Sequence, residues 1–340
     1  LRQTQIANPD LEWEKTAQLD IGVDFGFFND RLNGEIDYYI KNTTDLLLDV
    51  PVPGSSGFRT QTQNLGEIEN KGFEIVLNSN NLVGDFKWST SLNFARNQNK
   101  VKALAPGQDI IDDGSFNVVK VGEAIGTFFG AEYAGVDPAN GDALWYINKP
   151  GQERATTNDF NEAEFVVLGN PNPDFIGGIT NSFSYKGVSL DFTFQGVYGN
   201  DIQLGGDVFM ACNACWFDNQ TKEQLKSWKQ PGDITNIPEA RLGYSNGDQE
   251  RSSRYLSNGS YLRLRTLQLG YEFPKSLLGG VGLSRLRVYV IGQNLLTFTD
   301  YKGWDPEVSS DDFTTNTAFG LDFYSAPQPR TITFGLNVGF

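Results

Sequence analysis

The sequence contains no histidine and only two cysteines and one methionine in 340 residues. Without histidine there is no Ser-His-Asp or Cys-His nucleophile and no imidazole metal ligand, and two cysteines cannot form a four-thiolate zinc site. The carboxylate pairs Asp112-Asp113 and Asp311-Asp312 stand in predicted loops with no base beside them. We therefore predict a protein that is not an enzyme, with no catalytic residues, no metal and no cofactor.

Basic residues are scarce too. The chain has 27 Lys and Arg against 42 Asp and Glu, which gives a net charge of −15 and a pI near 4.5. Affinity for nucleic acid depends largely on Lys and Arg that neutralise phosphates. We therefore exclude nucleic acid as a partner.

Long apolar runs are missing as well. No run approaches the roughly 18 residues of a membrane-spanning helix, and the mean hydropathy is −0.37, so a helical membrane protein is excluded. A membrane β-barrel is not excluded, because a strand crosses the hydrocarbon in about 9 to 11 residues of which only every second is apolar. The first residue is Leu1, the only methionine is Met210 and no secretory signal is visible, so we expect a processed or partial product.

Period-two alternation is the strongest pattern that is present. Residues 19, 21, 23, 25 and 27 are all Leu, Ile, Val or Phe, whereas the residues between them are Asp or Gly. Such alternation indicates a strand with one apolar and one polar face. Nine such strands are predicted, at 18–28, 32–41, 73–77, 86–94, 179–185, 188–198, 261–273, 285–295 and 331–340.

The connections decide between a soluble sandwich and a membrane barrel, since both have strands of this kind. Short turns near 29, 82, 186 and 279 alternate strictly with long connections at 42–70, 97–174, 200–259 and 296–329. Soluble domains rarely carry such loops, whereas outer-membrane barrels pair short periplasmic turns with long extracellular loops. We predict an all-β fold, a transmembrane antiparallel β-barrel.

This orientation places the end of the last strand in the periplasm and the start of the first strand outside. Nine strands cannot close a bacterial barrel, which has an even number of strands. Two free edges in lipid would leave unpaired backbone groups at a cost of several kcal/mol each. We therefore expect further strands from a partner or from missing N-terminal sequence, and we expect that the segment is not stable in a bilayer alone.

Several aromatic residues are candidates for specific roles, with packing as the alternative for each. Phe28, Tyr38, Phe86, Tyr198, Tyr271 and Phe298 fit interfacial girdles. Trp145, Trp216 and Trp304 are the candidate substrate-binding residues, because loop aromatics could stack on sugar or peptide ligands, as could Tyr146, Phe217, Trp228, Phe323 and Tyr324. Phe340 ends an amphipathic last strand and so resembles the assembly signal of Gram-negative outer-membrane barrels.

The two cysteines, Cys212 and Cys215, stand in the motif C-N-A-C within a long loop. A local disulfide made in an oxidising compartment is favoured over a redox motif, because no βαβ pattern lies nearby. Metal binding is the weakest alternative. The stretch D-P-A-N-G-D at 137–142 resembles a calcium loop but has Ala139 and Gly141 at ligand positions, so we predict a plain Asn-Gly turn.

A set of dispersed motifs resembles one known family. These are N-P-D-L-E-W-E-K from Asn8, D-Y-Y-I-K-N-T-T-D-L-L from Asp37, N-L-G-E-I-E-N-K-G-F-E from Asn64, G-N-P-N-P-D-F from Gly169, S-Y-L-R-L-R-T-L-Q-L-G-Y from Ser260, G-Q-N-L-L-T-F-T-D-Y-K-G-W-D-P-E from Gly292 and the closing P-R-T-I-T-F-G-L-N-V-G-F. Together, and in this order along nearly the whole chain, they resemble the C-terminal barrel region of SusC/RagA-like TonB-dependent outer-membrane transporters.

The resemblance implies that residues 1–340 are a C-terminal segment of a 22-stranded barrel whose plug domain and TonB box lie outside this chain. It also implies energised import of glycan or peptide fragments across the outer membrane of Bacteroidota. The expected partners are a SusD-like surface lipoprotein, TonB through the missing N-terminal region, outer-membrane lipids and the outer-membrane assembly machinery. Alternatives are a non-importing barrel that acts as a structural or docking subunit, or a secreted all-β binding module.

Overall fold

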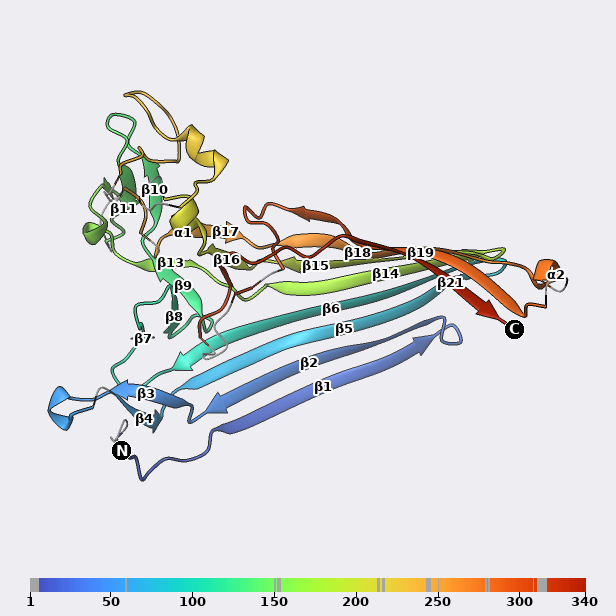
Figure 1. The fold of residues 1–340 in the computed structure, drawn as a ribbon. Helices are drawn as coiled ribbons and strands as arrows, with labels where there is room; N and C mark the ends of the chain where they lie inside the picture. The colour runs from blue at the N-terminus through green and yellow to red at the C-terminus, as the bar shows by residue number, and fades with distance from the viewer. Residues whose placement is uncertain are drawn as a thin grey trace, which may run out of the picture.

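The computed structural model describes residues 6–58, 60–149, 151, 154–212, 215, 218–242, 246–249, 251–278, 280, 282–307, 309–310 and 317–340. Figure 1 shows a long, curved sheet with a cluster of loops at one end. None of the described helices is both long and apolar enough to cross a membrane.

One antiparallel sheet contains all nine predicted strands, in the order β1-β2-β5-β6-β14-β15-β18-β19-β21. Their bounds are β1 Lys15–Phe27, β2 Leu32–Thr44, β5 Glu67–Val83, β6 Phe86–Ala103, β14 Phe175–Tyr185, β15 Val188–Tyr198, β18 Tyr261–Glu272, β19 Arg285–Thr299 and β21 Thr331–Gly339. The all-β prediction is confirmed. The sheet curves but does not close, so among the described residues β1 and β21 are its two edges.

Several strands are longer than predicted. β5 has 17 residues and β6 has 18. The sequence pattern fades toward the loop end because consecutive residues are polar there, as in R-N-Q-N-K at 96–100. Backbone pairing continues nevertheless, with Asn70 opposite Asn99 and Glu69 opposite Lys100. Alternation thus marks only the part of each strand that has an apolar face.

The apolar face of the sheet is exposed. Val23 lies opposite Ile36, which lies opposite Ile75, so these side chains share one face. Val23 is 58% exposed and Phe334 on β21 is 82% exposed, although both are large and apolar. The face is therefore not covered by any described part of the chain.

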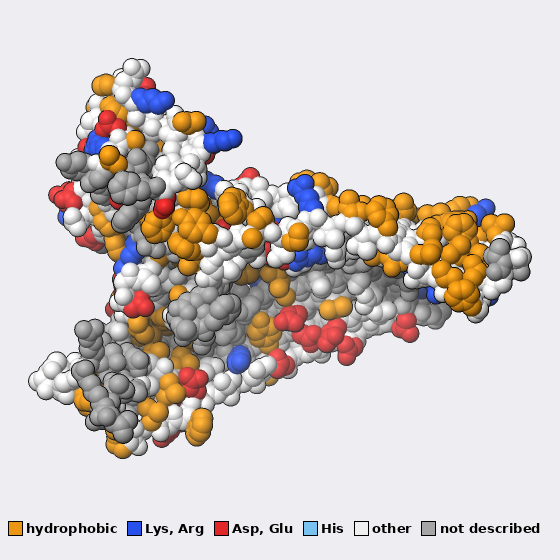
Figure 2. Space-filling model, in the orientation of Figure 1, with side chains coloured by type: hydrophobic (Ala, Val, Ile, Leu, Met, Phe, Trp, Pro, Cys, Tyr) orange, Lys and Arg blue, Asp and Glu red, His pale blue; other side chains and the backbone are white. Residues whose placement is uncertain are grey.

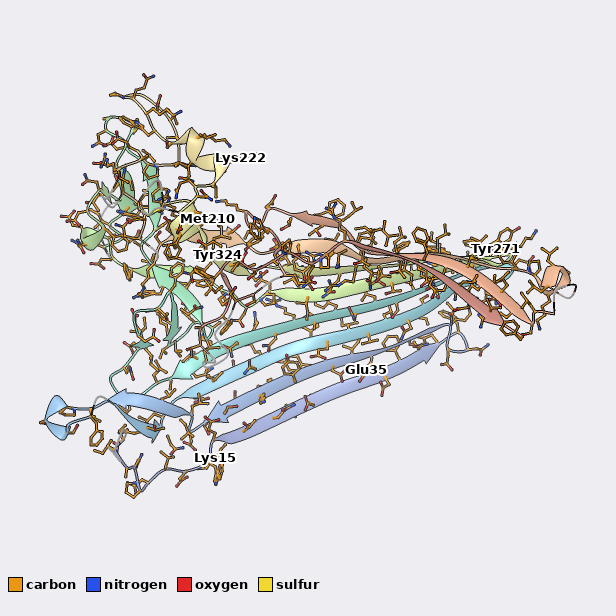
Figure 3. The ribbon with its side chains drawn as sticks, in the orientation of Figure 1. Lys15, Glu35, Met210, Lys222, Tyr271 and Tyr324 are labelled. Atoms are coloured by element: carbon orange, nitrogen blue, oxygen red, sulfur yellow. A yellow bond between two sulfur atoms is a disulfide. The ribbon has the colours of Figure 1, made fainter. Side chains whose placement is uncertain are left out.

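The other face of the sheet is polar. Asp24 lies opposite Glu35, and a row of Ser91, Thr180, Thr193 and Thr266 crosses four neighbouring strands. Acidic side chains gather over the middle of β1 and β2 in Figure 2, where Figure 3 labels Glu35. The two faces of the sheet are thus chemically opposite, as the alternation predicted.

Short and long connections lie at opposite ends of the sheet (Figure 1). The short ones cover 28–31, 84–85, 186–187 and 273–284, the last with α2 (Lys275–Leu278). The N-terminus lies at the loop end and the C-terminus at the turn end, as predicted. The positive φ angles at Lys186 and Gly187 form the tight turn between β14 and β15.

The long connections have structure of their own. The first holds β3 (Leu47–Pro51), η1 (Gly54–Ser56) and β4 (Thr60–Asn64). The second holds β7 Ile110–Ile111, β8 Asn117–Lys120, β9 Thr127–Gly130, β10 Tyr133–Val136, β11 Ala143–Tyr146, β12 Thr156–Thr157, η2 Phe160–Glu162 and β13 Val166–Gly169. The third holds β16 Asp201–Leu204, α1 Asp207–Met210, η3 Lys222–Lys226, η4 Ser253–Tyr255 and β17 Leu256–Asn258, and the fourth holds β20 Leu321–Asp322. The predicted turn at 137–142 is confirmed: it joins β10 to β11, and Asp137 N–H donates to the Asp142 carbonyl over 2.8 Å.

The buried core lies mainly in this loop layer. Its clusters are Ala131, Ala143, Trp145 and Ala163; then Val101, Leu104 and Val119; and then Ile202, Leu204 and Tyr301. This arrangement follows from the sheet, because its apolar side chains point outward and cannot supply an internal core.

Candidate functional site

A cavity of about 940 Å³ lies where three of the long connections meet. Its walls come from β10 at Tyr133, from residues 204–255 around α1, and from residues 302–325 between β19 and β21. Figure 3 labels Met210 and Tyr324, which line it from two of these connections. The cavity is therefore a product of loop packing and not of any one sequence segment.

Arg254 and two tyrosines form one wall. The guanidinium of Arg254 donates to the Ala211 carbonyl over 2.8 Å and lies 5.9 Å from the ring centre of Tyr133. The hydroxyl of Tyr133 donates to the Asn236 carbonyl over 3.0 Å, and burial raises the pKa of Tyr133 to about 12. Burial also raises the pKa of Tyr255 far above its ordinary range. Both phenols are therefore neutral hydrogen-bonding groups at physiological pH.

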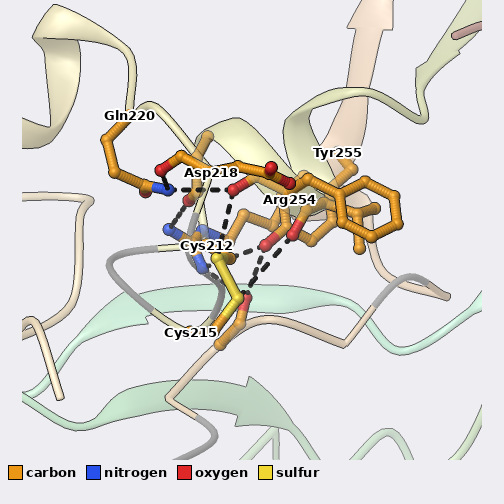
Figure 4. Close-up of a disulfide and its surroundings, with 10 residues drawn as sticks. Cys212, Cys215, Asp218, Gln220, Arg254 and Tyr255 are labelled. Atoms are coloured by element: carbon orange, nitrogen blue, oxygen red, sulfur yellow. Dashed lines mark hydrogen bonds between the residues drawn. A yellow bond between two sulfur atoms is a disulfide. The ribbon is translucent and has the colours of Figure 1, made fainter. Parts of the chain in front are cut away.

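A disulfide joins Cys212 to Cys215 beside this wall, which confirms the predicted local bridge (Figure 4). Cys212 is buried, and the Gln220 side-chain amide donates to the Phe209 carbonyl over 2.9 Å on the same loop. Arg254, through its bond to the Ala211 carbonyl, holds the end of α1 against the cavity.

Two carboxylates, Asp207 and Asp322, line another side of the cavity. Asp322 is buried and accepts a hydrogen bond of 2.6 Å from the Tyr301 hydroxyl. Burial raises the pKa of Asp207, and the negative charge of Asp322 raises it further, while Lys302 and Arg254 partly oppose the change. This side of the cavity therefore attracts hydroxyl donors and cations.

Exposed aromatic rings form the rim. Trp304 is 68% exposed, Tyr324 is also exposed, and both line the cavity. The rings of Tyr324 and Phe323 meet edge to face with centroids 4.7 Å apart, which holds Tyr324 in place. Trp304 and Tyr324 thus offer flat apolar faces above a polar interior.

The three candidate tryptophans do not share one surface. Trp145 is 1% exposed and packs between Tyr133 and Phe160, with ring centroids at 5.2 and 5.1 Å, so no face of its ring is open to a ligand. We therefore omit Trp145 from the candidate surface. Trp216 lies outside the described residues. Trp304 is the candidate that the structure places at the cavity.

Sequence reasoning missed Asp207, Asp322, Tyr133 and Arg254. No local motif distinguishes these residues, because the cavity joins positions up to about 190 residues apart. Among the described residues, no group of three or more Cys, Asp or Glu could hold a metal ion. Stacking, hydrogen bonding and ion pairing are the chemistry that this arrangement offers.

Comparisons with known proteins give a consistent picture. Residues 2–146 match the family model described as TonB dependent receptor-like, beta-barrel. A TonB-dependent receptor of Formosa agariphila is 39% identical over 99% of this chain and 35% of its own length. The TonB-dependent receptor SusC of Bacteroides thetaiotaomicron is 30% identical over 98% of this chain and 32% of its own.

A solved structure agrees with these sequence relatives. The chain superposes on the structure of the RagAB peptide transporter with a TM-score of 0.83 and 32% identity, covering 98% of this chain and 36% of that one. The chain thus spans about a third of the length of the relatives that it matches. By sequence and by fold together, it belongs to the β-barrel of the SusC- and RagA-like TonB-dependent receptors.

Proposed function

We propose that this chain forms part of the barrel wall and the extracellular loops of an outer-membrane transporter that imports glycan or peptide fragments in a TonB-dependent manner. In this proposal residues 1–340 supply the C-terminal strands of a 22-stranded barrel, and the plug and the TonB contact belong to a preceding region. The relatives named SusC and RagAB peptide transporter support it.

One observation carries the proposal: a nine-stranded sheet exposes its apolar face and turns its polar face inward along the curve. An exposed apolar surface of this extent is unfavourable in water and is stabilised by contact with lipid. The polar face then borders the passage. The alternation of short turns and long loops agrees with short periplasmic turns and extracellular loops.

The cavity beside Trp304 is the proposed contact for the imported fragment. Its aromatic rim suits the apolar faces of sugar rings or peptide side chains, and Asp207 and Asp322 suit hydroxyl or ammonium groups. Glycans and peptides both carry these groups, so the cavity agrees with either class.

A SusD-like lipoprotein is the proposed partner at the loop end. Leu225, Ile234 and Leu242 are large apolar side chains that are more than 70% exposed on the third long connection. Replacing Leu225 and Ile234 together by Ser should lower recovery of the lipoprotein with affinity-tagged transporter. Unchanged recovery would place the contact elsewhere.

Phe340 is the proposed assembly signal. It is 94% exposed at the turn end of the sheet, directly after β21, the strand that carries Phe334. This position would leave the ring open to the assembly machinery at the periplasmic side.

Uptake by the full-length transporter in its native outer membrane tests the function. Trp304→Ala should lower uptake of a labelled fragment by up to roughly ten-fold, because one aromatic contact contributes about 0.5–1.5 kcal/mol. Trp13→Ala is the control, since Trp13 is also largely exposed but does not line the cavity. If deletion of the whole gene changed uptake of neither saccharides nor peptides, the structural or docking role would replace the import proposal.

A further inference from the structure

The segment between β19 and β21 is held against the polar face of the sheet. It leaves β19 after Thr299 and enters β21 at Thr331. One of its legs reaches Arg263 on β18 through Asp305, and the other leg reaches the same carboxylate through the backbone N–H of Gln328. Arg263 lies opposite Gln195 and Thr297, so its side chain is on the polar face.

A buried ion-pair network makes this contact. Arg263 is 2% exposed and Asp305 is 4% exposed, and their charged groups lie 2.5 Å apart. Arg263 also pairs with Glu307 at 2.6 Å, and Arg265 pairs with the second oxygen of Glu307. The Arg263 Nε donates to the Thr297 hydroxyl over 3.0 Å, so the guanidinium is satisfied on three sides.

Asp305 joins the two legs of the segment. Its carboxylate accepts from the backbone N–H of Glu307 over 3.0 Å and from that of Gln328 over 2.9 Å. Asn294 adds a second tie, because its amide donates to the Pro329 carbonyl over 3.1 Å and its oxygen accepts from Arg265 over 3.0 Å. The segment is therefore fastened at both legs by groups on β18 and β19.

Adjacent bulges in β18 and β19 aim these groups. Leu264 lies opposite Phe194 and Thr266 lies opposite Thr193, so Arg265 is an extra residue. Across β19 the register skips Asn294 and Leu295, and Asn294 has a φ of 53°. A bulge of this kind redirects side chains. Here it sends both Arg263 and Arg265 to the polar face, while Leu264 and Leu267 stay on the apolar face.

The network also positions the cavity. The segment supplies Lys302, Gly303, Trp304, Asp322, Tyr324 and Ser325 to the cavity wall. Trp304 directly precedes Asp305, the residue at the centre of the network. Fixing Asp305 therefore fixes Trp304 relative to the barrel wall.

We propose that Arg263, Arg265 and Asn294 are positioning residues that latch the two described legs of the segment, 302–307 and 321–329, onto the barrel wall, so that these legs are a permanent wall of the passage and not a gate. This rests on the proposed transport function. Release of the segment would leave buried charges without partners, both on β18 and on the segment itself. The segment therefore stays in place while substrate passes.

Hydrogen–deuterium exchange on the full-length transporter in detergent tests the latch without any substrate. Arg263→Met should speed exchange of the peptide that covers 302–310 by about a hundred-fold, because local opening controls exchange and a buried carboxylate loses its partner. Arg285→Gln is the control, since it breaks an exposed ion pair with Glu272 at the turn end. Glu307→Gln is a milder second variant, for use if Arg263→Met does not fold. Unchanged protection in a folded variant would overturn the latch.

Two further measurements separate a fixed wall from a gate. Arg263→Met, which opens the latch, should make cells sensitive to vancomycin, a large polar antibiotic, because the passage is then less well closed. Arg285→Gln should not. A variant with an engineered disulfide between Asn294→Cys and Pro329→Cys should show the same uptake in its oxidised form as in its reduced form. Loss of uptake that a reductant restores would show that the segment must move, and would overturn the proposal. A protein that takes up no fragment but retains the exchange result would refute the proposed function and leave the latch standing.

Discussion

At the scale of single residues, glycines on the strands leave room for tyrosine rings from the neighbouring strand. Tyr289 lies directly opposite Gly335 on the neighbouring strand, and a Cβ built on Gly335 would lie 2.0 Å from Tyr289 Cζ, which is a clash with the ring. Tyr39 likewise lies opposite Gly72, and a Cβ built on Gly72 would lie 2.8 Å from the Tyr39 hydroxyl. The ring and the glycine thus form one packing unit across the strand pair.

Gly335→Ala should destabilise the barrel by about 1–3 kcal/mol, as overpacking does elsewhere. The measurement is the temperature at which the full-length protein loses its fast-migrating folded band on a gel. Gly84→Ala is the control, because a Cβ built there meets nothing within 4 Å. Equal shifts for the two variants would contradict the packing argument.

The Asp305 carboxyl gives the latch a pH dependence. Burial alone would raise its pKa, but the bond from Arg263 and the backbone N–H groups of Glu307 and Gln328 outweigh burial and hold the pKa below its ordinary value of 3.8. A carboxyl with a lowered folded pKa stabilises the fold above its ordinary pKa, and this stabilisation is lost as pH falls through the folded value.

We therefore expect constant exchange protection of the peptide 302–310 from neutral pH down to 3.8, after correction for intrinsic rates, and a loss of protection in more acidic buffer. Asp305→Asn should be less protected throughout and should lack this loss. Protection that persists in strong acid would argue against a charged latch.

At the scale of elements, the alternation of β1 assigns each side chain to a face. Val23 is exposed on the apolar face, and Asp24 faces Glu35 on the polar face. Val23→Arg should impair assembly, since a cation at the midplane of the lipid face costs about 2–4 kcal/mol, whereas Asp24→Arg should be tolerated. The amount of folded protein in outer-membrane fractions measures this. Equal tolerance of both variants would defeat the assignment of faces.

Alternation predicted all nine strands but not their full lengths or the bulges. In β18 the apolar residues fall at 262 and 264 and then at 267, 269 and 271, so the phase changes at Arg265. This change is visible in the sequence and indicates an extra residue. What the extra residue binds is not visible, because Glu307 is 42 residues away.

At the scale of the whole molecule, the sheet has two open edges among the described residues, at β1 and β21. An unpaired backbone group in lipid costs several kcal/mol. Residues 1–340 expressed alone with an export signal should therefore fail to form a heat-modifiable band in the membrane, whereas the full-length protein should form one. A stable inserted band from the segment alone would show that the edges pair with each other or with a second copy.

The sequence by itself determined the class of fold, the number and order of the strands, the apolar face and the alternation of short turns with long loops. These features follow from local periodicity, because neighbouring residues on a strand point to opposite faces. The tertiary structure alone decided that Trp145 is buried, that Trp304 lines a cavity and that Arg263 holds Asp305. Such contacts join distant positions, as when the Tyr133 N–H donates to the Ser253 hydroxyl 120 residues away. They depend on how the long loops pack against one another at the end of the sheet, and no local pattern in the sequence predicts that packing.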